Sequence, residues 1–510
     1  MIISLSVLVI TIIVSGTYAL YKAQLSKNIG VNTTTHGLAY YINYVKGTDI
    51  TAATLNPSTS YEGGASSDIE FWKKDDSYDI YGKIELTVNT IGTNLSNSPA
   101  LKYAVVNNGN VLKEGSLKGT TSGSKVTILK NLYLEQTKQI YTVYVWLDNS
   151  EELGNISNES LSISVDCTAS LQKEPTAADT IISLYTSAAK VTATNNSITY
   201  NTAPSVSLMN DRLGGTTTDL DGGNIRYYGA NPNNYIYFNC SDYSNQTSST
   251  CETWRIIGVF DGKLKLIKGS QIGTYSWDNK NTSTGAENDT GKNDWTTARL
   301  MKLLNPSNYY KVDSNDNNLG QSLYYNSASG KCYSGQNNAT VDCDFTSTGI
   351  KNAETRNMIA ETTYNLGGWN SNSVYSNQIY EYERGTTVYS GRPTTWKGKI
   401  ALAYPSDYGY AADLNQCKDK TLYDYDNRTC TSNNWMKAII TNNGSNTGWL
   451  LTPRSGSSSN AWYVNSGGFV SRDSIAYVAY GAVPVLSLSS ELGIESGGDG
   501  SSSKPYKLSA

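Results

Sequence analysis

The chain has 510 residues, with 40 Lys and Arg, 44 Asp and Glu, one His and a net charge of −4. A chain of this length predicts two or three domains with their own cores. Only 16% of residues are charged, and no basic stripe is interleaved with aromatics, which argues against nucleic-acid binding. Polarity comes from Asn, Ser, Thr and Gly together with 39 Tyr. This composition is typical of adaptable recognition surfaces, and equally of a secreted protein from an organism with Asn/Tyr-rich codon usage.

Residues 1–25 are predicted to be a signal peptide or membrane anchor. The run Ile2 to Leu20 is almost wholly apolar, and Thr17-Tyr18-Ala19 could supply a cleavage site. Lys22 and Lys27 follow the run and no basic residue precedes it. The positive-inside rule would then place the large domain in the cytoplasm. The paired cysteines described below outweigh these two lysines, so we expect Met1 to be an internal start and the protein to be extracytoplasmic.

Residues 30–167 predict an all-β domain. Ile84, Leu86 and Val88 alternate with polar residues, as do similar residues in 141–147 and 161–165. Asn107-Asn108-Gly109 is a strong hairpin turn signal. Several half-buried strands with turns between them favour a β-sandwich.

Residues 168–192 predict a linker with a short helix. Lys173-Glu174-Pro175-Thr176 interrupts the strand pattern, and Ala177 to Ala189 has helical spacing.

Six of the seven cysteines form close sequence neighbours. We expect disulfides between Cys240 and Cys251, between Cys332 and Cys343, and between Cys417 and Cys430. Each would close a polar loop, which implies an oxidising, extracytoplasmic compartment. No Cys-x-x-Cys cluster favours a metal site instead. Cys167 is left over, as a buried thiol or as a point of intermolecular pairing.

Residues 193–510 predict a second, α+β domain with short strands and long loops. Trp254 to Phe260 and Lys263 to Lys268 should form a tight hairpin around Asp261-Gly262. A helix is expected to start at Asp294, and another to run from about Asn352 to Leu366 and end at a positive-φ cap, Gly367-Gly368. The final residues GDGSSSKPYKL predict a turn and a closing strand.

Residues 448 to 488 contain a Trp-Leu-Leu strand, an Arg in a Ser/Gly-rich loop, a Trp-Tyr strand and a Val-Pro-Val strand. This pattern resembles the C-terminal half of a C-type-lectin-like fold, in the version shared by formylglycine-generating-enzyme-like domains and many bacterial surface proteins. The resemblance implies a recognition module. Ala482 stands where that family typically has an Arg, so any salt bridge that relatives make there is absent. The export segment followed by the run IYTVYVWLDNSEE resembles TasA/camelysin-like matrix and fibre proteins, and a generic immunoglobulin-like spacer explains it equally well.

The candidate ligand-binding residues are those of the C-terminal loops, because loops on a rigid scaffold carry binding side chains. We expect these to be exposed: Tyr463, Arg472, Tyr477 and Tyr480. Three further residues are expected to be structural. Trp449 and Trp462 would lie in the core, and Arg454 would bury its guanidinium against backbone carbonyls.

No catalytic residue is predicted. His36 is the one histidine and lies near the N-terminus, so a Ser-His-Asp or Cys-His site in the second domain has no base. The family resemblance raises a copper-dependent oxidase, but the cysteine spacing departs from it. No metal ligand set is predicted. Calcium is a minor alternative for the loops Asp219 to Asn224 and Asp278 to Asp294, which lack the full pattern of a calcium-binding loop.

The leading hypothesis is therefore a bacterial cell-surface or fibre-associated protein whose lectin-like domain binds a glycan or a protein. The sandwich would serve as a stalk that self-associates, and the N-terminal segment would contact the membrane. The alternative is a structural matrix or pilus-like subunit without a ligand.

Overall fold

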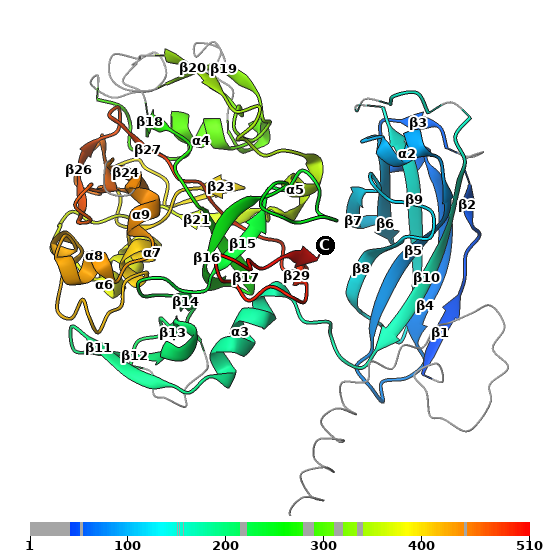
Figure 1. Cartoon of the computed structure of the whole chain (residues 1–510), viewed down its shortest axis with the longest axis horizontal. Helices are drawn as coiled ribbons and strands as arrows, with labels where there is room; N and C mark the ends of the chain where they lie inside the picture. Colours follow the sequence, from blue (N-terminus) through cyan, green and yellow to red (C-terminus); the bar gives the residue numbers. More distant parts are fainter. Residues whose placement is uncertain are drawn as a thin grey trace, which may run out of the picture. The chain divides into compact units, whose positions relative to one another are not determined.

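The computed structural model describes residues 41–51, 55–149, 151, 153–156, 158–214, 222–278, 290–310, 320–333, 340–442 and 446–509. The chain divides into two compact units, Met1–Glu174 and Pro175–Ala510 (Figure 1). The predicted signal peptide or anchor, residues 1–25, lies outside the described residues. Among the helices that are described, none is long and apolar enough to cross a membrane.

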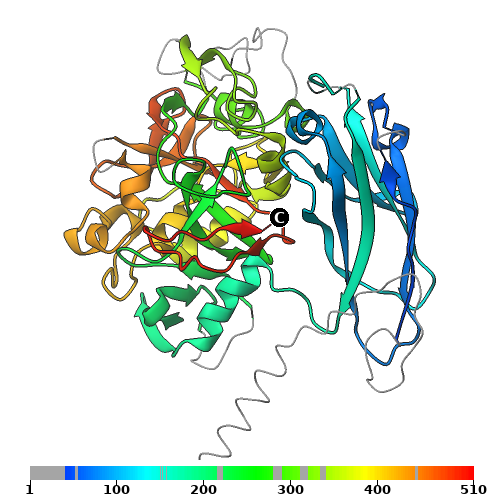
Figure 2. The same ribbon diagram turned by 45° about the vertical axis from the view of Figure 1, so that its right-hand side comes forward.

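The first unit is a β-sandwich, as predicted. Its two sheets have long strands that run in roughly the same direction in both views (Figures 1 and 2). One sheet has the spatial order β1 (Ile42–Val45), β4 (Ala65–Lys73), β9 (Ile140–Asp148), β6 (Leu101–Asn107) and β7 (Asn110–Ser116), with β3 (Pro57–Ser58) paired to β9. The other has the order β2 (Ile50–Thr51), β10 (Leu161–Ser170), β5 (Tyr81–Ile91) and β8 (Lys125–Tyr133). One short helix, α2, covers Thr93–Asn97.

Period-two alternation builds the core of this unit. Ile84, Leu86 and Val88 on β5 are each 0% exposed, because successive side chains of a strand point to opposite faces. The predicted hairpin is confirmed: β6 ends at Asn107 and β7 begins at Asn110. Asn108 and Gly109 both have positive φ, 49° and 76°, as a two-residue turn of this type requires.

The described residues of the second unit form two larger sheets and three two-stranded ones. The first larger sheet has the order β11 (Val191–Asn195), β12 (Ile198–Ala203), β13 (Leu208–Asn210), β14 (Ile225–Tyr227), β16 (Glu252–Phe260), β17 (Lys263–Lys268), β28 (Val485–Ser487) and β23 (Ile400–Ala401), with β15 (Tyr235–Phe238) paired to β16. The second, here called the C-terminal sheet, has the order β18 (Thr274–Ser276), β27 (Ala479–Gly481), β24 (Gly448–Pro453), β25 (Asn460–Val464) and β26 (Val470–Ile475). The small pairs are β19 (Ser329–Tyr333) with β20 (Thr340–Asp344), β21 (Thr362–Asn365) with β22 (Thr395–Gly398), and β29 (Gly493–Ile494) with β30 (Leu508–Ser509).

Short helices connect these strands. They are α3 (Ala177–Ser187), α4 (Arg299–Leu304), α5 (Ala353–Met358), α6 (Ser376–Arg384), α7 (Pro405–Tyr410), α8 (Arg428–Ser432) and α9 (Lys437–Ile440), with 3-10 turns such as η4 (Pro204–Val206) and η8 (Leu422–Asp424). The unit is therefore β-rich with short helices, which supports the β-rich part of the predicted fold.

Two predicted helices are shorter than expected. The helix expected from Asp294 begins only at Arg299, because the Asp294 carboxylate accepts hydrogen bonds from Thr296 N and Oγ1 (3.0 and 2.6 Å) and closes a local turn. The helix expected over 352–366 ends at Met358, and Thr362–Asn365 forms strand β21 instead. Its β-branched and aromatic residues pair with β22.

Gly367 does not provide the predicted positive-φ cap. A Cβ atom there would lie 2.3 Å from the Tyr382 carbonyl oxygen and 2.5 Å from that of Gly385. Glycine is therefore required by the close approach of the backbone to the end of α6.

The segment 168–192, expected as a linker with a short helix, is shared between the two units. β10 of the first unit runs to Ser170, and α3 packs into the core of the second. α3 begins with a capping box between Thr176 and Asp179. Its Ala177 N–H donates to the Leu492 carbonyl (2.6 Å), which connects the start of this unit to its end.

A group of buried charges lies inside the second unit. Arg226 pairs with Asp211 (Nε–Oδ2, 2.5 Å) and with Asp407 (Nη1–Oδ1, 3.0 Å), and Lys265 pairs with the other oxygen of Asp407. These four side chains are no more than 7% exposed. Burial opposes ionisation of Asp407, but Lys265 and Arg226 hold its pKa below the ordinary value.

The three predicted disulfides are confirmed: Cys240–Cys251, Cys332–Cys343 and Cys417–Cys430. Cys167 is a buried free thiol in the first unit. Disulfides form and persist in oxidising compartments, so the three bonds indicate an extracytoplasmic protein.

Candidate ligand-binding site

Two of the predicted ligand-binding residues come together on the C-terminal sheet. Tyr463 on β25 and Tyr480 on β27 have ring centroids 5.5 Å apart, and Tyr480 lies 4.7 Å from Trp449 on β24. Both tyrosines are half-buried and pack against the main core of the unit. They were expected to be exposed; instead each is half-buried and lies at the margin of the core.

Burial raises the pKa of Tyr463 above its ordinary value. Its hydroxyl is therefore protonated at neutral pH, where it can both donate and accept a hydrogen bond. Together with Tyr480, it offers aromatic surface with polar ends, which suits the apolar faces and hydroxyl groups of a sugar or the side chains of a protein.

Trp462 and Trp449 are buried, 0% and 2% exposed. Trp462 packs into a different cluster from Tyr463, because neighbouring residues of β25 point to opposite faces of the sheet. Trp449 lies on the Tyr480 side, and its indole N–H donates to the Tyr275 carbonyl (2.9 Å). Both residues occupy the structural positions expected of them.

Arg454 was expected to bury its guanidinium against backbone carbonyls, and the structure shows a different arrangement. Its side chain is 24% exposed and bonds to side chains: Nε donates to Asn370 Oδ1 (2.7 Å), and Nη1 to Asp473 Oδ1 (2.7 Å). Segment 368–372 lies beside β24 here, where a bridge joins Trp369 and Arg454. The guanidinium at the end of β24 therefore pairs with a carboxylate from β26. The sequence of the Arg-Ser-Gly loop alone does not show this partner.

Arg472 shares this carboxylate. Its guanidinium bonds to Asp473 Oδ1, and its backbone N–H donates to Asn372 Oδ1 (3.2 Å). Asn372 also donates to Asp473 Oδ2 (3.2 Å). We call these residues the Asp473 cluster: Asn370, Asn372, Arg454, Arg472 and Asp473. Because Asp473 is 45% exposed, the cluster presents donors and acceptors to solvent on strands next to Tyr463.

Tyr477 lies in the turn between β26 and β27, where its carbonyl accepts a hydrogen bond from Ser276 Oγ (2.6 Å). Its side chain was expected to be exposed, but it is half-buried. Ala482 is 0% exposed, and its backbone N–H donates to the Gly273 carbonyl (3.0 Å). The structure therefore brings Tyr463 and Tyr480 together directly, and connects Arg472 to Arg454 through Asp473.

The calcium alternative falls partly outside the described residues, which omit 215–221 and 279–289. The carboxylates at the two ends of the second loop, Asp278 and Asp294, accept hydrogen bonds from nearby protein groups. Asp278 accepts from the backbone N–H groups of Lys292 (2.9 Å) and Arg299 (3.2 Å), and Asp294 from Thr296. Across the part of the chain that is described, no group of three or more His, Cys, Asp or Glu could hold a metal ion.

The cysteines of the second unit are all used in its disulfides. Burial raises the pKa of Cys167 well above its ordinary value, which keeps that thiol protonated. His36 lies outside the described residues.

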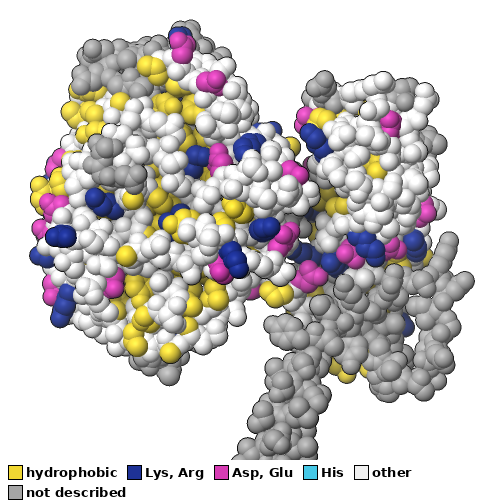
Figure 3. All heavy atoms as spheres, in the orientation of Figure 1, with side chains coloured by type: hydrophobic (Ala, Val, Ile, Leu, Met, Phe, Trp, Pro, Cys, Tyr) yellow, Lys and Arg dark blue, Asp and Glu magenta, His cyan; other side chains and the backbone are white. Residues whose placement is uncertain are grey.

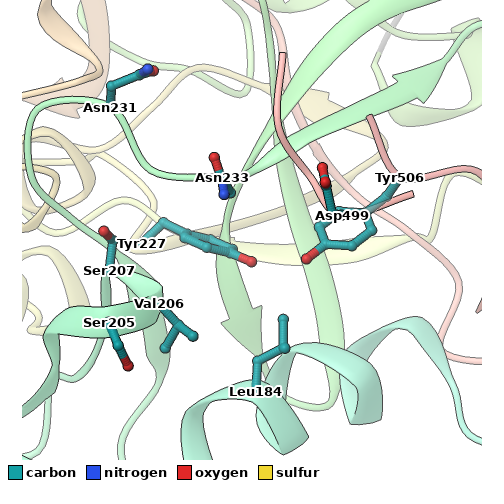
Figure 4. A pocket seen from close by; sticks show the side chains of 9 residues that line it. All are labelled: Leu184, Ser205, Val206, Ser207, Tyr227, Asn231, Asn233, Asp499 and Tyr506. Carbon is teal, nitrogen blue, oxygen red and sulfur yellow. The ribbon is translucent and has the colours of Figure 1, made fainter. Parts of the chain in front are cut away.

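A cavity that sequence reasoning missed lies elsewhere in the second unit (Figure 4). It has a volume of about 180 Å³. Its lining comes from segments far apart in the sequence: Leu184, Ser205, Val206, Ser207, Tyr227, Asn231, Asn233, Asp499 and Tyr506. The polar turn GDGSSSKPYKL was predicted, but no local pattern shows that it folds back beside α3.

No protein-family model matches the chain, and no curated protein matches it. Among solved structures, the receptor-binding domain of botulinum neurotoxin mosaic serotype C/D is 11% identical, with 52% of this chain and 75% of that chain covered and a TM-score of 0.15. A single-residue mutant of HCR/D is also 11% identical, with 52% and 76% covered and a TM-score of 0.14. TM-scores this low do not establish a shared fold, so the geometry of the chain itself has to support any functional conclusion.

Proposed function

We propose that this protein is an extracytoplasmic recognition protein, and that its second unit binds a glycan or protein ligand at the C-terminal sheet. The observation that supports this most directly is the half-buried Tyr463–Tyr480 pair beside the partly exposed Asp473 cluster. Rigid aromatic anchors next to Arg and Asn side chains are the usual chemistry of an adaptable binding surface. The family resemblance of residues 448 to 488 to lectin-like domains of bacterial surface proteins favours the same role.

The surface of the protein is suited to binding through short-range contacts rather than through long-range electrostatic attraction. On the face in Figure 3, Lys and Arg are dispersed among Asp, Glu and wide uncharged areas. With a net charge of −4, long-range attraction contributes little, and affinity has to come from short-range contacts.

A binding screen with substitutions at this surface tests the proposal. The full chain is screened against a glycan array and against host extracellular proteins, and bound ligands are titrated. Tyr463→Ala and Arg472→Ala should each weaken binding about tenfold, as the loss of an interface anchor does. Tyr78→Ala, at a tyrosine of the first unit that is 44% exposed, should leave affinity unchanged.

Stability measurements on the same variants separate binding from folding. Trp462→Ala should destabilise the second unit by about 3–5 kcal/mol, as large core truncations do. If a folded protein binds nothing in the screen, or if a bound ligand is indifferent to Tyr463→Ala and Arg472→Ala, this surface is not the site.

The second candidate function is structural, as a matrix or pilus-like subunit. β7 is an edge strand of the first unit, and its Val111 and Leu112 are 44% and 38% exposed. An exposed edge with apolar side chains is a template for adding another strand, here from a second copy of the chain. Sedimentation should then show concentration-dependent assembly that Val111→Lys abolishes and Lys113→Gln does not. A monomer at all concentrations would exclude this candidate.

A further inference from the structure

The cavity of about 180 Å³ is built from both ends of the second unit (Figure 4). Leu184 comes from α3, and Val206 from η4. Tyr227 comes from β14, and Asp499 and Tyr506 from the C-terminal segment. None of these residues belongs to the C-terminal sheet, so the cavity is separate from the surface of the proposed function.

Hydrogen bonds hold the C-terminal segment in place beside β15. Tyr235 N–H donates to the Gly500 carbonyl (2.8 Å), Tyr506 N–H to the Tyr235 carbonyl (2.9 Å), and Tyr237 N–H to the Tyr506 carbonyl (2.9 Å). A site assembled by such a backbone ladder is already ordered before a ligand arrives, so binding does not have to order it.

Two tyrosines form the buried side of the cavity. Tyr227 and Tyr506 are 2% and 5% exposed, and Figure 4 shows their hydroxyl groups pointing toward the middle of the cavity. The Tyr227 hydroxyl is buried and has no hydrogen-bond partner within the described part of the chain. Since a hydroxyl carries one donor and two lone pairs, the Tyr227 hydroxyl can both donate a hydrogen bond to a ligand and accept one from it.

Polar groups surround the open side. Asn231, Asn233 and Asp499 are exposed, and Asp499 is the only charged side chain among the described residues of the lining. The Asp499 carboxylate accepts from Ser501 N–H (2.9 Å), which fixes its orientation. Hydrogen bonds from Ser501 lower the pKa of Asp499, so it is ionised at neutral pH. It therefore disfavours an anionic ligand and accepts hydrogen bonds from hydroxyl or N–H groups.

The shape and size narrow the ligand class. The volume of about 180 Å³ is below the roughly 300–1,000 Å³ of pockets for drug-sized ligands, which leaves room for one small ring. Leu184 and Val206 supply apolar contact on one side, whereas the tyrosine, asparagine and serine groups supply both donors and acceptors. A lone ammonium group would use only acceptors. A ring with apolar C–H faces and several neighbouring hydroxyl groups uses both kinds of surface.

We propose that this cavity binds one neutral sugar residue, such as the terminal residue of a glycan, with Asp499 accepting hydrogen bonds from its hydroxyl groups. The site gives the second unit a carbohydrate contact that does not depend on the Tyr463–Tyr480 surface.

The test is a direct binding measurement on the full chain. Methyl glycosides of glucose, galactose, mannose and N-acetylglucosamine are titrated by saturation-transfer NMR up to about 50 mM, a range that covers millimolar dissociation constants. At least one should bind. Asp499→Asn should weaken that binding about tenfold, because a hydrogen bond to a charged group is lost. Val206→Trp should fill the cavity and abolish binding.

Matched variants keep the result interpretable. Asp342→Asn removes a carboxylate that is 86% exposed on β20 and should leave binding unchanged. Tyr506→Phe removes one hydroxyl while keeping the ring, and should weaken binding several-fold. Backbone NMR or thermal unfolding of each variant shows whether it is folded.

Three outcomes would overturn this inference. One is that no glycoside binds the folded protein. The second is that a glycoside binds but Val206→Trp has no effect; if Tyr463→Ala then weakens that binding, the proposed function stands without this site. The third is that methylammonium chloride, titrated in parallel, competes with or exceeds the sugars, which would make the cavity an amine site.

Discussion

The two units of this protein are β-rich in different ways. The first is a sandwich of long strands whose core consists of alternating apolar side chains, and its one described cysteine is a free thiol. The second has shorter strands and helices, three disulfides, and charges buried beneath its sheets. Segments far apart in its sequence pack side by side, as the C-terminal segment and β15 do.

This difference shows how each unit can hold its shape. In the first unit, regular strand pairing provides the backbone hydrogen bonds, and each sheet buries one apolar face. The fold of this unit therefore needs few side-chain hydrogen bonds to its backbone. The second unit has much irregular backbone, whose polar groups need side-chain partners. Asn293 shows this: its amide donates to the carbonyls of Arg454, Ser457 and Asn460 (3.1, 2.8 and 2.9 Å). Irregular loops supported in this way are suited to present binding residues.

Reduction of the disulfides should have the largest effect, and only on the second unit. The closed loops have sequence separations of 11, 11 and 13 residues, and loops of this size contribute up to about 3 kcal/mol each in the chain-entropy model. Hydrogen-exchange mass spectrometry with and without reductant should show faster exchange in β16 and β24 and unchanged exchange in β5 and β10. Equal loss of protection in β5 would contradict the contrast between the units.

Removing a buried charge should have the next largest effect. Asp407 neutralises both Arg226 and Lys265 and also accepts the Tyr404 N–H (3.0 Å). Asp407→Asn leaves the buried Lys265 without a counter-charge and leaves Arg226 with Asp211 alone, which costs about 3–5 kcal/mol. Urea unfolding followed by tryptophan fluorescence measures the loss, and hydrogen exchange assigns it to the second unit. A loss below about 1 kcal/mol would mean that water reaches these charges.

The stability of the second unit should also depend on pH through Glu383. This side chain is 0% exposed and accepts hydrogen bonds from Ser406 N–H and Oγ. Burial raises its pKa from 4.5 to about 7. A folded-state pKa above the unfolded value means that the protonated form stabilises the fold at low pH, and that this contribution is lost as the pH rises from about 4.5 through 7.

A shift of this size corresponds to about 3 kcal/mol. Glu383→Gln mimics the protonated form, so the difference in unfolding free energy between this variant and the natural protein should be small at pH 5 and should grow up to pH 8. Exchange in the first unit, far from this residue in the chain, should not change between the two proteins. A pH-independent difference would show that Glu383 does not titrate in this range.

Local patterns predicted the regular parts of this molecule and missed its long-range contacts. The alternation in β5 and the turns at Asn108-Gly109 and Asp261-Gly262 are decided by residues close in sequence, and they were correct. Cysteine spacing predicted the three disulfides because each loop is short. The end of α5 at Met358 was missed, because pairing of β21 with β22 overrides helical spacing.

The candidate site shows the same limit. Its residues were chosen from one segment, 449 to 480, and Tyr463 and Tyr480 do meet there. Asn370 and Asn372, which complete the Asp473 cluster, come from about 100 residues earlier, and the cavity joins α3 to the last turn of the chain. The periodicity of apolar residues in the sequence does not predict such contacts, because they depend on how distant loops pack.

The smallest effect is expected for a half-buried ion pair in the first unit. Lys46 Nζ lies 3.2 Å from Asp166 Oδ1, and the two side chains are 26% and 30% exposed. Water screens their attraction, and Thr87 Oγ1 already donates to the other oxygen of Asp166 (2.9 Å). Lys46→Met keeps the aliphatic stem and removes the charge, so it should cost less than about 1 kcal/mol. Urea unfolding measures the loss of stability. The ratio of this loss to that of Asp407→Asn compares a half-buried ion pair with a fully buried one. If Lys46→Met costs as much as Asp407→Asn, burial does not decide what an ion pair contributes in this protein, and the two units resemble each other more than their architecture implies.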